Sequence, residues 1–151
     1  MSKKDKQLIS LAEVNGEMLA QLHRQWIWAD KMRMQYEEGL KKRSAPVADL
    51  ENYIISAEWV LMMTWYALLF TLCEFIKNNQ ISIPEIDAPM RSVYGDLKLF
   101  RNAILHIQSK YWSNKLFEIF KDRTSALKIR QVHGGLGKAL LDEITSKQSL
   151  L

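Results

Sequence analysis

The residues best suited to chemistry in this sequence form one run, Arg101-Asn102-Ala103-Ile104-Leu105-His106. Arginine is always charged and presents a fork of donors that matches phosphate oxygens. Histidine titrates near neutrality and therefore accepts or donates a proton. The amide between them is suited to orienting either group or a substrate oxygen. These are the groups needed to cleave RNA without a metal ion, because a base must remove the 2′-hydroxyl proton and a cation must stabilise the charge added at phosphorus.

This run falls in a helix that we predict from about residue 89 to 108, with a proline in its first turn. Its core side is predicted to carry the apolar residues that recur at helical spacing, namely Val93, Leu97, Phe100, Ile104 and Ile107. Relative to Arg101, Asn102 lies at about 100°, His106 at about 140° and the apolar cluster at about 280° around the helix axis. We therefore expect Asn102 and His106 to point away from the core of their own subunit.

Leu99 and Ala103 are predicted to share this outward face. An apolar rim around polar side chains is typical of a surface that meets another protein surface. A two-fold dimer would bring two such sets together across one groove and would supply a second histidine as the acid.

The string Phe100-Arg101-Asn102-Ala103-Ile104-Leu105-His106 resembles the Arg-(four to six residues)-His motif of HEPN domains (higher eukaryotes and prokaryotes nucleotide-binding). Arg101, Asn102 and His106 match this motif residue by residue, and the motif occupies the same place near the end of the third helix of a small bundle. The resemblance covers about residues 89 to 112. It implies a helical bundle that dimerises, with paired motifs forming a metal-independent endoribonuclease site. Many members of the family are toxins or act in phage defence or RNA processing, whereas others only bind nucleotides or partners.

Further candidate site residues lie on either side of the motif. Lys110, Tyr111 and Trp112 follow it directly, and we predict that they supply a phosphate contact and a stacking surface for an RNA base. The alternative is that the two aromatic residues close the core at a loop. Glu74 is a carboxylate in the most apolar predicted helix, where burial without a partner is costly. It is predicted to pair with a base of the third helix or to line the groove.

Apolar spacing along the chain predicts an all-α fold, a bundle of four to five helices in a single domain over residues 1–151. Glycine (6) and proline (3) are scarce, which also favours helices. Prolines, glycines and polar runs separate the predicted helices. The predicted helices cover about residues 10–42, 49–79, 89–108, 114–131 and 136–146.

The distribution of charge favours an anionic partner at the C-terminal helices. The net charge is +4, but residues 91–151 hold eleven Lys and Arg against five Asp and Glu, whereas residues 1–90 hold ten against twelve. Phosphate is the commonest polyanionic partner, so RNA fits this asymmetry. A solvated basic face without a ligand explains the charge equally well.

Several other features are interpreted as structural. The run Gly134-Gly135-Leu136-Gly137-Lys138 lacks the spacing of a phosphate-binding loop and is predicted to join two helices. His23 and His133 have no acid or thiol at metal-ligand spacing, so we predict surface or loop positions for both and no metal site. The single Cys73, inside an apolar run, is predicted to fill space in the core of a protein from a reducing compartment.

The sequence also leads to expectations about location and partners. The charged N-terminus does not resemble a signal peptide, so we expect a cytoplasmic protein. The chemistry expected of Arg101, Asn102 and His106 needs no cofactor. The apolar stretch 59–76 is long enough to cross a bilayer, but a buried central helix has the same composition, and we expect no membrane partner. The first functional hypothesis is a homodimeric endoribonuclease, with an antitoxin or regulatory protein as a further partner. The second is a non-catalytic module that binds RNA, nucleotides or a protein through the same face.

Overall fold

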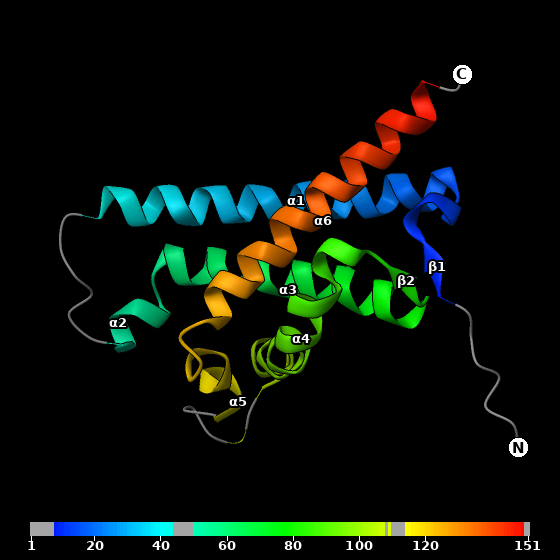
Figure 1. Ribbon diagram of the computed structural model, residues 1–151. Helices are drawn as coiled ribbons and strands as arrows, with labels where there is room; N and C mark the ends of the chain where they lie inside the picture. The colour runs from blue at the N-terminus through cyan, green and yellow to red at the C-terminus, as the bar shows by residue number, and fades with distance from the viewer. Residues whose placement is uncertain (1–7, 44–49, 108, 110–113, 150–151) are drawn as a thin grey trace, which may run out of the picture.

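The computed structural model of the chain describes residues 8–43, 50–107, 109 and 114–149, and these ranges form an all-α bundle (Figure 1). Within these ranges there are four long helices and two short ones. The long helices are α1 (Gly16–Lys42), α3 (Ala57–Asn78), α4 (Pro84–Leu105) and α6 (Ser125–Gln148). The short helices are α2 (Leu50–Ile54) and α5 (Asn114–Phe117), and single 3₁₀ turns occur at Leu11–Glu13 and Glu118–Phe120. The all-α prediction is confirmed, although the number of helices exceeds the predicted four to five.

Helices α1 and α3 form the largest helix–helix contact and run antiparallel, while α6 crosses α1 obliquely and packs on α4 (Figure 1). The last turns of α6 extend beyond the body of the bundle (Figure 1). A two-residue parallel pairing between β1 (Ile9–Ser10) and β2 (Ile81–Ser82) fastens the segment before α1 to the connection between α3 and α4. The start of α1 and the end of α3 therefore lie at the same end of the bundle (Figure 1).

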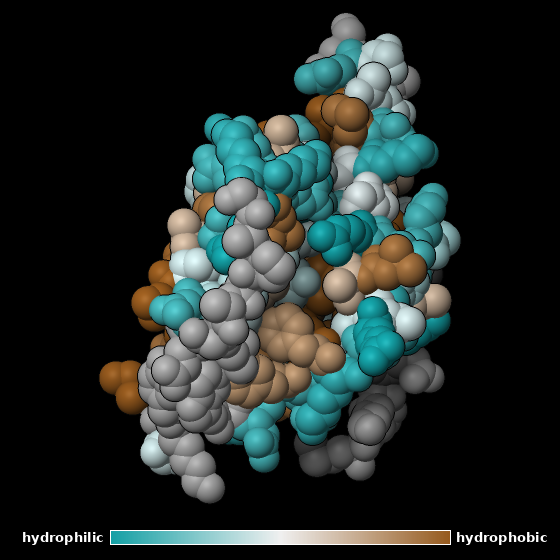
Figure 2. All heavy atoms as spheres, turned by 90° about the vertical axis from the view of Figure 1, so that its left-hand side faces the viewer, coloured by the Kyte–Doolittle hydropathy of each residue, from teal (hydrophilic) through white to brown (hydrophobic). Residues whose placement is uncertain are grey.

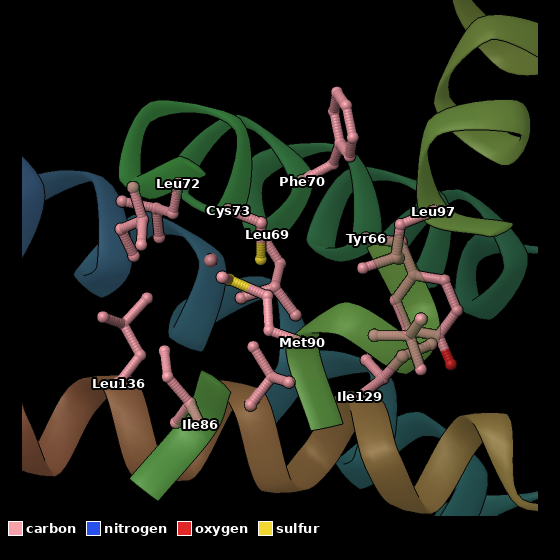
Figure 3. Packing of buried hydrophobic residues seen from close by; sticks show 14 of the residues in the cluster. Tyr66, Leu69, Phe70, Leu72, Cys73, Ile86, Met90, Leu97, Ile129 and Leu136 are labelled. Carbon is pink, nitrogen blue, oxygen red and sulfur yellow. The ribbon is translucent and has the colours of Figure 1, made fainter. Parts of the chain in front are cut away.

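The core lies between α1, α3, α4 and α6, and its side chains are apolar; Figure 3 shows part of it. Trp65, Leu69, Phe70 and Cys73 of α3 are completely buried. Burial raises the pKa of the Cys73 thiol to about 12, so the thiol stays protonated and inert at neutral pH. The interpretation of Cys73 as a space-filling core residue is confirmed.

Helix α3 is, within the described ranges, the one helix long and apolar enough to cross a membrane. Half of its most apolar stretch is buried inside the bundle. On the face seen in Figure 2, hydrophilic side chains alternate with hydrophobic ones, which are visible near the middle and at the left edge. The core helix of a bundle has the same length and composition as a membrane span.

Two predicted helix boundaries are wrong. The predicted helix 49–79 is interrupted at Ile55–Ser56, because Ser56 caps α3: its hydroxyl accepts a hydrogen bond from Trp59 N at 3.2 Å. Helix α4 begins at Pro84, which occupies its first turn, whereas Pro89 lies inside the helix. A proline at the first helical position needs no backbone donor there, and the sequence offers two prolines that fit this rule.

The predicted break at His133-Gly134-Gly135 is also wrong, since α6 is continuous through it. Because glycine has no Cβ atom, these residues instead allow α6 to lie close to side chains of α4 and α1. A Cβ atom at Gly135 would lie 2.5 Å from Ile86 Cγ2, and one at Gly137 would lie 2.2 Å from Trp26 Cζ2. The break lies earlier, in the turn before Ser125, where the Asp122 carboxylate accepts a hydrogen bond from Thr124 N at 2.8 Å.

Candidate functional site

The end of α4 carries the motif and presents part of it to solvent. Val93, Leu97 and Phe100 of this helix are buried, as predicted, whereas Ile104 is only half-buried. The helix ends at Leu105, and His106 is its C-cap residue in extended backbone conformation, with its amide donating to Asn102 O at 3.2 Å. His106 is exposed and Asn102 half-buried. Ile107, predicted on the core side, is wholly exposed because the helix has already ended.

The Arg101 guanidinium lies between α4 and α3. Its Nη2 is 3.5 Å from Glu74 Oε1, and its Cζ lies 4.7 Å from the centre of the Phe70 ring. The aromatic face attracts the cation, and the carboxylate fixes its direction. Arg101 Nε is buried and has no hydrogen-bond partner in the described part of the chain. The guanidinium is therefore held in place while part of its donor capacity is unused.

A pocket of about 420 Å³ opens beside this ion pair. Arg101 and Glu74 supply its charged lining, and most of the remainder is apolar. The other lining residues are Met63, Thr64, Ala67, Leu68, Thr71, Ile104 and Leu105. The Thr64 and Thr71 hydroxyls donate to backbone carbonyls of their own helix, so their polar atoms are satisfied and their methyl groups are available to the pocket.

Exposed apolar residues precede and follow His106 along the chain. Leu105 is 62% exposed, Leu99 is exposed and Ile107 is 105% exposed. Exposed large apolar residues that gather at one end of a helix are typical of a surface covered by another protein. Of the two residues predicted to form the apolar rim, Leu99 is exposed, whereas Ala103 is half-buried.

The other predicted site residues have different outcomes. The structure brings Glu74 and Arg101 together, as the prediction of a basic partner for Glu74 requires. Lys110, Tyr111 and Trp112 lie outside the described residues. Phe70 was missed by sequence reasoning, because an apolar ring in an apolar helix carries no polar signal. The spacing from Glu74 back to Thr71, Ala67 and Thr64 is helical and was the available signal for the pocket wall.

The prediction of a surface or loop position for His133 is wrong. This residue is 3% exposed, and its ring links three helices. Nδ1 accepts a hydrogen bond from Trp65 Nε1 at 3.1 Å, and Nε2 lies 2.9 Å from Asp30 Oδ1. Because Trp65 only donates, Nε2 carries the proton and donates to Asp30. Burial lowers the pKa of His133, although Asp30 opposes this effect, so the ring is a neutral structural group.

Within the described ranges, no group of three or more His, Cys, Asp or Glu residues is arranged to hold a metal ion. Comparison of the chain with protein-family models, with curated proteins and with solved structures finds no match.

Proposed function

We propose that this chain is a metal-independent endoribonuclease of the HEPN type, with Arg101, Asn102 and His106 as its site. The observation that carries the proposal is the position of the Arg101 guanidinium, held by Phe70 and Glu74 at the edge of an open pocket, one and a half helical turns before the exposed His106. A fixed cation and a solvent-accessible imidazole at one helix end are the two groups that RNA transesterification needs.

The proposed reaction needs no cofactor. His106 removes the proton of a ribose 2′-hydroxyl, and the 2′-oxygen attacks the adjacent phosphorus while Arg101 stabilises the charge on the phosphoryl oxygens. The bond from phosphorus to the 5′-oxygen breaks, and the leaving oxygen takes a proton from a second imidazole. The products are a 2′,3′-cyclic phosphate and a 5′-hydroxyl. Asn102 orients the reacting groups.

A second copy of the chain is proposed to supply the second imidazole. In support, the residues before and after His106, Leu105 and Ile107, are apolar and exposed. A two-fold interface places the same surface of both copies in contact, so it would bring two His106 residues to one groove. The proposed enzyme is a cytoplasmic homodimer with RNA as substrate, and a toxin or a defence protein is the biological role that fits such an activity.

One experiment distinguishes RNA cleavage by this protein from cleavage by a contaminating ribonuclease. Purified protein in excess chelator is incubated with single-stranded and structured RNA, alongside the variants His106→Ala and His23→Ala. Cleavage by the wild type and by His23→Ala, with loss in His106→Ala, is expected. Equal cleavage by both variants would exclude His106 as the catalytic base or acid.

A second candidate function is a non-catalytic binding module that uses the same face. The Glu74–Arg101 ion pair favours it, because a carboxylate already occupies one edge of the cation that would bind phosphate. This candidate predicts RNA or protein binding that survives His106→Ala, without cleavage at any enzyme concentration.

A further inference from the structure

A second pocket, of about 310 Å³, lies between α3 and α4. Its lining consists of Lys77, Met90, Arg91, Tyr94 and Gly95. Lys77 lies in the last turn of α3, and the other four residues lie within about a turn and a half of α4. Two of the five residues are cationic and none is acidic, so the lining of this pocket is positively charged.

The two cations that line the pocket have no carboxylate partner in the part of the chain that the structure describes. Spacing along each helix offers an acid to both, Glu74 one turn before Lys77 and Asp87 one turn before Arg91. Glu74 instead pairs with Arg101 at 3.5 Å. Asp87 instead accepts hydrogen bonds from Ser82 Oγ at 2.7 Å and from the amide of Ile83 at 3.1 Å. Both local acids are engaged elsewhere, so neither forms an ion pair with Lys77 or Arg91.

Tyr94 holds the lysine over the pocket. Lys77 Nζ lies 3.9 Å from the centre of the Tyr94 ring, within the range of a cation–π contact. Such a contact orients an ammonium group without neutralising it. Burial and the nearby Glu74 raise the pKa of the Tyr94 hydroxyl, so the phenol stays protonated and is able to donate a hydrogen bond to an anion.

Two aromatic residues, Tyr94 and Phe70, connect this pocket to the motif. The Tyr94 ring packs on Phe70 with their centres 5.3 Å apart, and Phe70 lies under the Arg101 guanidinium. Arg91 and Arg101 are ten residues apart on α4, which corresponds to about 15 Å along the helix axis. Several stacked nucleotides cover this distance, since the phosphates of one strand of a double helix are spaced by about 3.4 Å along its axis.

We infer that Lys77, Arg91 and Tyr94 form a subsite for a backbone phosphate of the RNA strand whose cleaved phosphodiester lies at Arg101. The inference rests on the proposed function for the identity of the strand. The subsite positions the substrate through charge and reads no base, because a backbone phosphate is the same at every nucleotide.

The test is binding of a fluorescent twelve-nucleotide RNA in which every 2′-hydroxyl is methylated, so that transesterification is blocked. Anisotropy is measured over a series of salt concentrations for the wild type, for Lys77→Gln/Arg91→Gln and for the control Lys31→Gln/Lys41→Gln. The control also removes two positive charges, but from exposed positions of α1. In the first variant we expect Kd to rise by about tenfold or more and the salt dependence to become shallower, by about 0.7 in log–log slope for each lost phosphate contact. The control is expected to differ from the wild type by less than about threefold.

Equal affinities of the two double variants would overturn the inference, and so would a wild type that binds no RNA. Cleavage of unmodified RNA by the wild type, measured separately, reports on the proposed function. If cleavage occurs but the two variants bind alike, the subsite is wrong and the enzyme assignment stands. If the wild type binds through Lys77 and Arg91 but cleaves no RNA, Lys77 and Arg91 still form a phosphate subsite, and the enzyme assignment is wrong.

Discussion

Arg101 of α4 and Glu74 of α3 form an ion pair of 3.5 Å at the mouth of a pocket, with the guanidinium lying over the ring of Phe70. The pair is partly exposed, with 25% of the arginine and 38% of the glutamate side chain accessible, so solvent weakens it. Its importance is therefore for the orientation of Arg101 more than for the stability of the bundle.

The first prediction concerns the shape of the cation. Arg101→Lys keeps the charge but loses the planar fork, and we expect RNA cleavage to fall by about 10²–10³-fold, as when one transition-state donor is removed. Cleavage rates under single-turnover conditions provide the measurement. Glu74→Gln keeps the shape of the carboxylate and is expected to cost about tenfold at most, because an exposed pair is worth about 1 kcal/mol or less. Equal rates for Arg101→Lys and the wild type would argue against a phosphate contact.

The second prediction concerns self-association. Leu105→Glu places a charge in the proposed interface and is expected to shift the protein from dimer to monomer, because burying an unpaired carboxylate is costly. Leu127→Glu is the matched control, since Leu127 of α6 is 60% exposed and Leu105 is 62% exposed. Sedimentation velocity measures the change. A dimer that persists in Leu105→Glu, or one lost equally in both variants, would contradict this interface.

The third prediction concerns pH. Burial lowers the pKa of His133 below its ordinary value of 6.5, so below that pH the unfolded chain binds a proton that the folded chain refuses. The free energy of unfolding is therefore expected to fall as the pH decreases from about 6.5 toward the folded pKa. Urea denaturation at pH 7, 6 and 5 measures this decrease, and His133→Gln should show a smaller decrease over the same interval.

The contribution of Asp30 falls in a separate pH interval. Burial acts to raise its pKa, but hydrogen bonds with His133 and Arg33 lower it below 3.8. The stability that Asp30 contributes is therefore lost only as the pH falls below about 3.8 toward the lowered pKa of the folded state.

The pH 7 to 5 interval thus tests His133 and not Asp30. A free energy of unfolding of the wild type that is constant from pH 7 to 5, or a profile identical to that of His133→Gln, would contradict a neutral buried imidazole.

The fourth prediction uses two glycines of α6. A Cβ atom at Gly137 would lie within 3.0 Å of three atoms of the Trp26 ring, whereas one at Gly134 would meet nothing within 4 Å. Gly137→Ala is expected to destabilise the fold by about 1–3 kcal/mol through overpacking. Gly134→Ala is expected to stabilise it by about 1 kcal/mol, because alanine is the better helix former. Chemical denaturation distinguishes the two, and destabilisation by both would indicate a break in α6.

The apolar spacing of the sequence was sufficient for the fold class and for part of the core side of α4. Val93, Leu97 and Phe100 are buried as predicted, whereas Ile104 is half-buried and Ile107 is exposed beyond the end of the helix. The continuity of α6 was not predictable from local preference. Glycine weakens a helix by itself, and only the packing of Gly135 on Ile86 and of Gly137 on Trp26 explains its presence there.

The candidate site was predicted only in part for the same reason. Residue types and spacing singled out Arg101 and His106, but the contact with Glu74 joins residues 27 positions apart and depends on how α3 packs on α4. The burial of His133 between Asp30 and Trp65 likewise arises from three helices that are distant in sequence. Such contacts follow from tertiary packing, which spacing within one helix does not reveal.

The most direct measurement of the central claim is the chemical identity of the new RNA ends, determined by mass spectrometry of the fragments that the wild-type protein releases in excess chelator. A mechanism in which His106 activates the 2′-hydroxyl and Arg101 stabilises the phosphoryl group yields 2′,3′-cyclic phosphate and 5′-hydroxyl ends. Fragments that end in 3′-hydroxyl and 5′-phosphate groups, or intact RNA after prolonged incubation, would contradict it.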